Sequence, residues 1–208
     1  VAAGTATMTY TVTGTGGCSN ATATRTVTVT SAPHAGTLSG NQALCSNATV
    51  TFTSNGDAGG AWTSDNTAVA TINGSTGAIT PVAAGTATMT YTVTGTGGCS
   101  NATATRTVTV TSAPNAGTLS GNQALCGNAT VTFTSNGDAG GAWTSSNAAV
   151  ATINTSTGAI TPVAAGTATM TYTVTGTGGC SNATATRTVT VTAAPNAGTL
   201  SGNQALCA

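Results

Sequence analysis

Cysteine is the residue type whose pattern could carry chemistry in this sequence. Six cysteines stand alternately 27 and 54 residues apart, at Cys18, Cys45, Cys99, Cys126, Cys180 and Cys207. Each repeating unit holds two of them and no regular histidine, so it cannot supply the four ligands of a structural zinc site, and disulfides are favoured over metal. The spacing alone leaves the pairing open, because a cysteine could pair within a unit, pair between units or stay free.

Other catalytic or metal-binding chemistry finds little support. His34 is the only histidine, and Asn115 and Asn196 stand at its equivalent positions. The sequence has no Ser–His–Asp or Cys–His set, no paired carboxylates and no phosphate-binding loop. We therefore expect neither enzyme activity nor a cofactor or metal. Asp57 and Asp138 recur in the turn sequence NGDAGG, where Asp commonly accepts hydrogen bonds from its own backbone.

The composition excludes several kinds of partner. Only 3% of the 208 residues are charged, whereas globular proteins average about 25%. Three basic residues make no basic stripe, so we expect no nucleic-acid partner. No apolar run is long enough for a membrane helix. The chain starts at Val1 inside a repeating unit, without a signal segment, and we expect it to be a window on a longer exported polypeptide.

An 81-residue repeat organises the chain. The sequence VAAGTATMTYTVTGTGGCSNATATRTVTVT begins at Val1, Val82 and Val163. Module 1 is residues 34–114 and module 2 is residues 115–195. Residues 1–33 are then the C-terminal part of a preceding module, and residues 196–208 are the N-terminal part of a following one. The full modules differ only at His34/Asn115, Ser46/Gly127, Asp65/Ser146, Thr67/Ala148, Gly74/Thr155 and Ser112/Ala193.

Each module alternates with a period of two, which predicts β-strands. In residues 86–94 threonines alternate with apolar residues, and residues 49–53 and 107–111 show the same pattern. Turns rich in Gly and Asn separate these runs. Seven or so short strands in about 80 residues predict an all-β fold of tandem immunoglobulin-like β-sandwich modules. The expected aromatic core is Phe52, Trp62 and Tyr91, with Phe133, Trp143 and Tyr172 in module 2.

Arginine recurs at one position of each unit, at Arg25, Arg106 and Arg187. Arg106 stands two and four residues before the apolar Val108 and Val110. In a regular strand these three side chains share one face, so the charged side chain would point inward. We expect either a β-bulge at this position or a guanidinium that reaches Asp57 while its stem lies on the core.

Three strings carry a family resemblance: WTSDNTAVATI from Trp62, GAIT from Gly77 and VAAGTATMTY from Val82. Together they resemble the bacterial immunoglobulin-like domain of group 2. Such domains occur in tandem in adhesins related to intimin and invasin, and in long bacterial surface proteins. The resemblance implies an extracellular location at the cell surface. It also implies a function that is mostly that of a stalk and only sometimes that of a binding domain.

In an immunoglobulin-like sandwich the strand topology separates the cysteines of one module. Cys45 falls beside the A–B turn and Cys99 in the F–G turn (residues 95–101), so about nine strand residues would place them roughly 30 Å apart. A disulfide tolerates a Cα separation of at most about 7 Å. Stacked modules favour the pair Cys45–Cys180. Cys18, Cys99, Cys126 and Cys207 would then pair with copies outside this sequence. Pairing within a module, free cysteines and cysteines paired between chains remain alternatives.

The most favoured function is a structural repeat segment of an extracellular bacterial stalk or filament, stiffened by disulfides. Its partners would be homotypic neighbouring modules or chains, because a neutral surface lacks the charge repulsion that keeps molecules apart. One alternative is an adhesin that binds glycan or partner cells. A second is an ice-binding protein that uses its Thr-x-Thr faces, although Thr is also the natural uncharged residue for an outward strand position.

Overall fold

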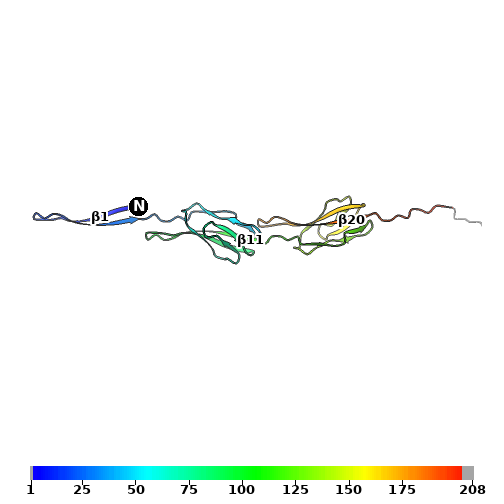
Figure 1. The fold of residues 1–208 in the computed structure, drawn as a ribbon, viewed down its shortest axis with the longest axis horizontal. Coiled ribbons are helices and arrows are strands. Elements are labelled where there is room, and N and C mark those ends of the chain that lie inside the picture. Colours follow the sequence, from blue (N-terminus) through cyan, green and yellow to red (C-terminus); the bar gives the residue numbers. More distant parts are fainter. Residues whose placement is uncertain (1, 203–208) are drawn as a thin grey trace, which may run out of the picture. The chain divides into compact units, whose positions relative to one another are not determined.

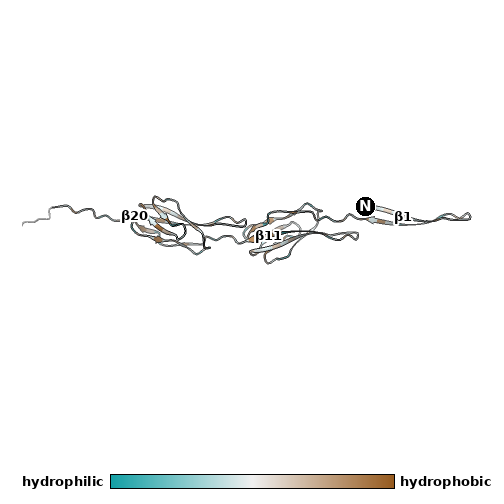
Figure 2. Ribbon diagram, turned by 180° about the vertical axis from the view of Figure 1, so that it is seen from behind, coloured by the Kyte–Doolittle hydropathy of each residue, from teal (hydrophilic) through white to brown (hydrophobic). Residues whose placement is uncertain are grey.

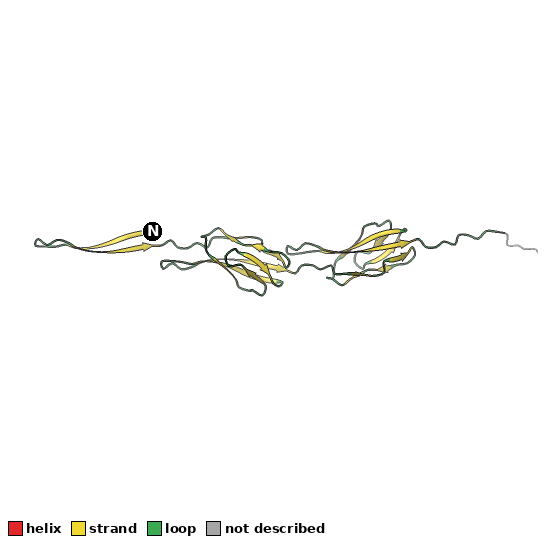
Figure 3. Ribbon diagram, viewed as in Figure 1, coloured by secondary structure: helices red, strands yellow, loops and turns green. Residues whose placement is uncertain are grey.

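The computed structural model describes residues 2–202. All regular secondary structure in that part of the chain is β-strand, and it contains no helix (Figure 3). The described residues form two compact units. The first contains residues 2–112 together with Gly178–Cys180, and the second contains Ala113–Thr177 and residues 181–202. A short segment of module 2 therefore belongs to the unit built by module 1.

A β-hairpin precedes the first complete sandwich. Strands β1 (Gly4–Val12) and β2 (Ala21–Val29) pair antiparallel from Gly4↔Val29 to Val12↔Ala21 (Figure 1). Alternation gives the hairpin one apolar face, but Met8 and Tyr10 on that face are 56% and 72% exposed. The hairpin repeats the two longest strands of a module without the residues that cover them in modules 1 and 2.

The first sheet of module 1 has the strand order β4-β11-β10-β7. The long strands β10 (Gly85–Val93) and β11 (Ala102–Thr111) pair antiparallel over nine residues. On one side β7 (Ala61–Ser64) adds antiparallel to β10, and on the other β4 (Ala43–Cys45) adds parallel to β11.

The second layer of module 1 consists of short strands. Strands β5 (Val50–Thr51), β9 (Ala78–Pro81) and β8 (Ala70–Ile72) form a three-stranded sheet, and β3 (Leu38–Ser39) pairs with β6 (Thr53–Ser54). The alternating run over residues 49–53, which predicted one strand, is therefore interrupted. At the interruption Phe52 donates its N–H to the Gly77 carbonyl at 2.9 Å, and its side chain is completely buried.

Module 2 repeats this arrangement strand for strand. One sheet has the order β13-β20-β19-β16, the three-stranded sheet has the order β14-β18-β17, and β12 pairs with β15. The bounds are β12 Leu119–Ser120, β13 Ala124–Cys126, β14 Val131–Thr132, β15 Thr134–Ser135, β16 Ala142–Ser145, β17 Ala151–Ile153, β18 Ala159–Pro162, β19 Gly166–Val174 and β20 Ala183–Thr192.

Each module buries its own hydrophobic core between the two layers. Hydrophobic residues lie on the strands around β11 and β20, where Figure 2 is brown. Met89 and Val108 are fully buried because each occupies an inward position of its alternating strand. The six aromatic residues expected in the cores are all buried, and the Trp62 and Tyr91 ring centroids lie 4.8 Å apart. Two layers around one core define an immunoglobulin-like β-sandwich in each module.

The outward positions of the long strands are threonines in register. In module 1 the cross-strand pairs are Thr86↔Thr109, Thr88↔Thr107, Thr90↔Thr105 and Thr92↔Thr103. In module 2 the threonines of β19 and β20 pair in the same way. Each module therefore presents one sheet face that is polar, uncharged and regular over its two longest strands.

Strand β4 was not expected from the sequence, which placed Cys45 beside a turn. A three-residue strand is too short to show alternation, so the pattern could not reveal it. Backbone hydrogen bonds at both ends hold β4 to β11, from Thr109 N to Gln42 O at 2.7 Å and from Ser46 N to Thr111 O at 2.9 Å. Leu44, at the centre of β4, is buried in the core.

Candidate functional site

The cysteines make the most specific arrangement in the structure. Cys45 and Cys180 form a disulfide, with an S–S distance of 2.06 Å and a Cα–Cα distance of 4.8 Å. The two residues are 135 positions apart in the sequence and belong to different modules. The sequence favoured this pair over Cys45–Cys99. Both cysteines lie within the first compact unit, to which Gly178–Cys180 belongs.

Strand β4 fixes the position of Cys45. The parallel pairing places Cys45 opposite Thr111, the last residue of β11. Burial of Leu44 anchors β4 to the core, and Cys45 itself is only 3% exposed. The sulfur of Cys45 is thus presented at the end of the module 1 sheet by a strand that cannot shift without exposing Leu44.

The F–G turn of module 2 (residues 176–182) presents Cys180. Asn182 closes this turn by accepting a hydrogen bond from Gly176 N at 2.9 Å. Gly178 has φ +58°, and a Cβ at this position would lie 2.0 Å from the Thr111 hydroxyl oxygen. Only glycine allows the turn to lie this close to Thr111. The Cys180 sulfur lies 3.6 Å from the carbonyl oxygens of both Thr111 and Ser112. These are contacts, since a disulfide sulfur carries no hydrogen.

The F–G turn of module 1 (residues 95–101) repeats this geometry one repeat earlier. The thiol of Cys99 lies 3.7 Å from Thr30 O and 3.8 Å from Ser31 O. A Cβ on Gly97 would lie 2.1 Å from the Thr30 hydroxyl oxygen. Cys99 therefore occupies the same position against residues 30–31 as Cys180 does against residues 111–112. It does so without a disulfide.

The remaining cysteines form no disulfide within residues 2–202. Cys18 is an exposed free thiol, whereas Cys99 and Cys126 are partly buried free thiols. Cys207 lies outside the described residues. Pairing of these four with further copies stays a prediction.

The recurring arginine has neither of the two expected arrangements, a β-bulge or a contact with Asp57. The pairing Met89↔Arg106 continues without a bulge, and the guanidinium does not reach Asp57. Instead Arg106 donates to Leu38 O at 3.1 Å and to Gly40 O at 2.7 and 3.2 Å. Its Cζ lies 5.5 Å from the Phe52 ring centroid. Arg187 makes the equivalent contacts in module 2. The arginine therefore ties the edge pair β3–β6 to the main sheet.

Asp57 also differs from expectation, because its carboxylate does not bond its own turn. Its Oδ2 accepts a hydrogen bond from His34 N at 2.8 Å, and Asp138 accepts one from Asn115 N at the same distance. The contact uses the backbone of His34, so Asn serves equally well at that position. The Asp57 carbonyl accepts the Tyr91 hydroxyl at 2.8 Å. Asp57 thus joins the start of the module to its core.

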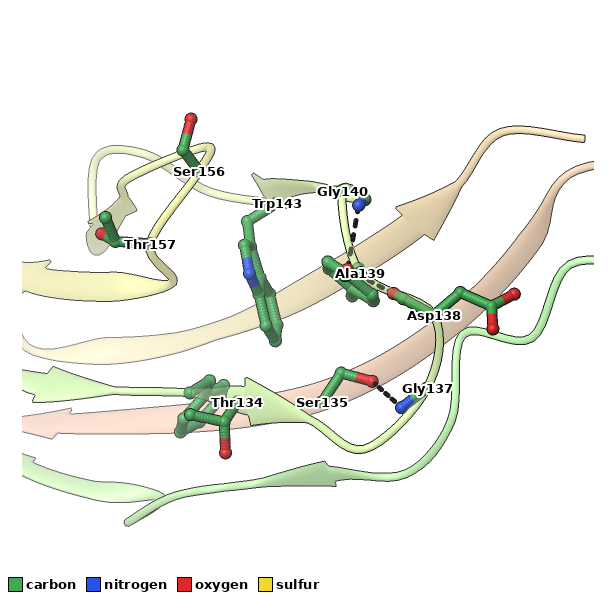
Figure 4. A pocket seen from close by; sticks show the side chains of 12 residues that line it. Thr134, Ser135, Gly137, Asp138, Ala139, Gly140, Trp143, Ser156 and Thr157 are labelled. Atoms are coloured by element: carbon green, nitrogen blue, oxygen red, sulfur yellow. Dashed lines mark hydrogen bonds between the residues drawn. The ribbon is translucent and has the colours of Figure 1, made fainter.

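An open pocket of about 380 Å³ lies beside Trp143, and one of about 410 Å³ lies at the equivalent position beside Trp62. Figure 4 shows the module 2 pocket, with the Asp138 carboxylate pointing away from the Trp143 ring. The Ser135 hydroxyl bonds Ala116 O and Gly137 N. The Tyr172 hydroxyl bonds Asp138 O and Gly141 N. These polar groups serve the fold, so the pocket offers few free groups to a ligand.

Two features are absent from residues 2–202. No group of three or more His, Cys, Asp or Glu side chains that could hold a metal ion occurs there. The same residues include no helix with the length and apolar character needed to cross a membrane.

No protein-family model and no curated protein sequence matches the chain. Among solved structures, the C-terminal 282-residue fragment of intimin, in complex with the intimin-binding domain of its translocated receptor, aligns with a TM-score of 0.45 and 15% identity. The alignment covers 74% of this chain and 63% of the intimin fragment. Murine CEACAM1b aligns with a TM-score of 0.42 and 12% identity, over 76% of this chain and all of that chain.

A SusE-like surface-located polysaccharide-binding protein from the heparin utilisation locus of Bacteroides thetaiotaomicron is also similar, with a TM-score of 0.31 and 18% identity. That alignment covers 74% of this chain and 32% of the other. This chain thus spans less than two thirds of the intimin fragment and about a third of the SusE-like protein. At these identities the likeness concerns the fold alone, and no family model supports the finer group 2 assignment.

Proposed function

We propose that the chain is a structural repeat segment of an extracellular bacterial stalk or filament, in which disulfides between modules fix the geometry of the array. The observation that carries the proposal is the disulfide between Cys45 and Cys180, which links residues of two different modules. A disulfide inside one module would stabilise that module alone. A disulfide from one module to the next also resists tension and bending along the array.

The surroundings of the disulfide support the proposal. Gly178 packs against Thr111, and the Cys180 sulfur contacts the backbone carbonyls of Thr111 and Ser112. Packing therefore positions the F–G turn of module 2 together with the covalent bond. Cys99 has the same position on residues 30–31. An interaction that recurs at a fixed sequence period propagates one geometry along a repeat protein. Near-identity of the modules serves this role, because identical modules make identical junctions.

An extracellular location accords with the proposal, because disulfides persist in oxidising compartments and are rare in the cytosol. The resemblance of residues 62–91 to group 2 bacterial immunoglobulin-like domains points to the same kind of surface protein. The proposed role is non-catalytic and needs no cofactor. Its partners are neighbouring modules or chains, and the uncharged threonine faces add no repulsion between them.

The adhesin alternative is less well supported by the geometry. A binding site for glycans needs free hydrogen-bonding groups around an accessible aromatic surface. Trp143 is only 3% exposed, and the hydroxyls of Ser135 and Tyr172 are used by the fold. Tandem copies of this pocket therefore do not favour the adhesin over the stalk.

Electron microscopy of native material tests the proposal. We expect a regular fibre with an axial repeat of one module, about 35–45 Å from strand lengths. Reduction of the disulfides should leave the modules folded but shorten the persistence length of the fibre. The control is a matched sample that is treated with the same alkylating reagent while its disulfides remain intact. Flexible, separate beads in the unreduced sample would contradict the proposed role.

A further inference from the structure

The Cys45–Cys180 disulfide determines which part of the chain can carry a pulling force. The two cysteines are 135 positions apart, so the bond closes a covalent loop that contains residues 46–179. A force applied on both sides of this loop passes along the backbone to Cys45, crosses the disulfide to Cys180 and continues along the backbone. The Cα atoms of the two cysteines stay 4.8 Å apart whatever happens inside the loop. Residues 46–179 therefore lie outside the path of the force.

Most of both hydrophobic cores lies inside this loop. Both modules fall entirely within the described residues. Among the buried core residues of module 1, only Ala35, Leu38 and Leu44 precede the loop. In module 2 only Val189 and Val191 follow it. Unfolding of the residues inside the loop does not lengthen the loaded path. Because a force favours a change in proportion to the lengthening that it gives, tension does not by itself favour unfolding of the cores.

Module 1 holds its loaded segment, residues 34–45, to the rest of the sandwich. Arg106, which lies inside the loop, donates to Leu38 O at 3.1 Å and to Gly40 O at 2.7 and 3.2 Å. Strand β4 at the end of the segment pairs parallel with β11. The side chains of Leu38 and Leu44 are buried in the core. Removal of this segment from the module would break all of these contacts.

The loaded segment of module 2, residues 180–195, consists mainly of β20. This strand of ten residues pairs with β19 and, on its other side, with β13. A strand rises about 3.2–3.4 Å per residue, and a fully extended chain reaches at most about 3.6 Å per residue. Pulling β20 straight would therefore lengthen it by only about 2–4 Å. A force does little work on a segment that the fold already holds extended.

We propose that the Cys45–Cys180 disulfide shields both hydrophobic cores from tension, so that residues 34–45 and 180–195 carry the load while residues 46–179 stay folded. The proposal rests on the proposed function, because a stalk or filament is loaded along its length. It goes beyond a fixed geometry, since a bond between modules could hold their arrangement and still let each core unfold under force. In the reduced chain the same force acts across both modules. Release of residues 46–179 would then lengthen the chain by roughly 450–490 Å.

The test is the stretching of single full-length chains in optical tweezers. Handles are joined enzymatically to peptide tags at the two ends, and free thiols are alkylated under native conditions, so that no other cysteine takes part. Oxidised chains are held at a force at which the reduced chain unfolds within seconds, and dithiothreitol is then added. We expect none of the roughly 450–490 Å to appear before the disulfide is cleaved. After cleavage it should appear in two separate steps, one for each module, because both cores are still folded when the bond breaks.

The order of these events separates the proposal from the proposed function. A single jump of the whole length at the moment of cleavage would overturn the proposal, because the cores would already have unfolded inside the intact loop. The disulfide between modules, and with it the proposed function, would still stand. A hidden length of roughly 180–195 Å would instead indicate a bond between Cys45 and Cys99, which are 54 positions apart. That result would overturn both.

A matched variant controls for effects of the reductant. The double variant Cys45→Ser/Cys180→Ser lacks the loop and should unfold in two steps at the same force, with or without dithiothreitol. The wild-type chain should match this variant only after reduction. An oxidised wild-type chain that lengthens as the variant does would overturn the proposal.

Discussion

Arg106 lies over the ring of Phe52, with its Cζ 5.5 Å from the ring centroid, on a strand position that alternation assigns to the core. The guanidinium is tolerated there because two backbone carbonyls, of Leu38 and Gly40, accept its hydrogen bonds. A charged group in a partly buried position needs such partners. The arginine thus replaces an apolar core residue and joins β3 to the long strands.

We expect Arg106→Ala to lower the free energy of unfolding by about 2–4 kcal/mol, because it leaves two carbonyls without their donors and removes the cation–π contact. Chemical denaturation followed by tryptophan fluorescence would measure this. Arg25→Ala is the matched control, since Arg25 makes none of these contacts among the described residues. It should change the stability by less than about 0.5 kcal/mol. Equal effects of the two changes would contradict this role.

The Tyr91 hydroxyl makes a second specific connection. It donates to Asp57 O at 2.8 Å and accepts from Gly60 N at 3.0 Å, and so holds the turn over residues 55–60 against β10. Tyr91→Phe should cost about 1–2 kcal/mol, because both backbone groups lose their partner. Tyr10→Phe, at the equivalent exposed position of the hairpin, should be neutral. Faster amide exchange at Gly60 in Tyr91→Phe alone would locate the effect, and unchanged exchange would argue against it.

Gly178 allows the F–G turn to approach Thr111, and this approach should control how fast the disulfide forms. Gly178→Ala places a Cβ 2.0 Å from the Thr111 hydroxyl oxygen. A clash of this kind costs about 1–3 kcal/mol, so formation of Cys45–Cys180 on reoxidation should slow about tenfold. Quenched reoxidation followed by peptide mapping gives the rate.

Two controls separate the clash from backbone strain in this experiment. Gly16 has a similar φ of +65° but nothing within 4 Å of its Cβ position, so Gly16→Ala should not change the rate. The double variant Gly178→Ala/Thr111→Gly also removes the Thr111 Cβ, which would lie 2.8 Å from the new Cβ, and should recover most of the wild-type rate. No recovery would show that strain at residue 178, and not contact with Thr111, causes the delay.

The fold was predictable from sequence to the extent that long strands show alternation. Nine alternating residues are enough to identify β10 and β11, and the period of 81 extends the assignment to both modules. Strand β4 could not be recognised, because three residues carry no period. The partners of Arg106 were equally hidden, since Leu38 and Gly40 lie 68 and 66 residues away and accept through their backbones.

The cysteine junction was partly predictable. The pair Cys45–Cys180 could be expected from which turns lie at which end of a sandwich, without any side-chain detail. The packing of Gly178 on Thr111 could not be inferred, because glycine in a Gly-rich turn gives no sign of what it approaches. The repeat of that contact at Gly97 and Thr30 is visible only in the structure.

The threonine faces lead to a prediction about ice. Cross-strand threonine pairs such as Thr88↔Thr107 make a regular array, but a twisted sandwich sheet matches a flat lattice poorly. We expect purified protein to show no thermal hysteresis even at high concentration. Nanolitre osmometry would measure it, with a Thr88→Lys/Thr107→Lys variant as the control. Hysteresis that this variant abolishes would favour the ice-binding alternative.

The disulfide between modules is tested most simply by peptide mapping of the unreduced full chain, alkylated under native conditions before digestion. We expect a peptide pair that joins Cys45 to Cys180, with Cys18 recovered as an alkylated free thiol or in links to other copies. A pair that joins Cys45 to Cys99 would contradict both the disulfide between modules and the stalk that is proposed from it.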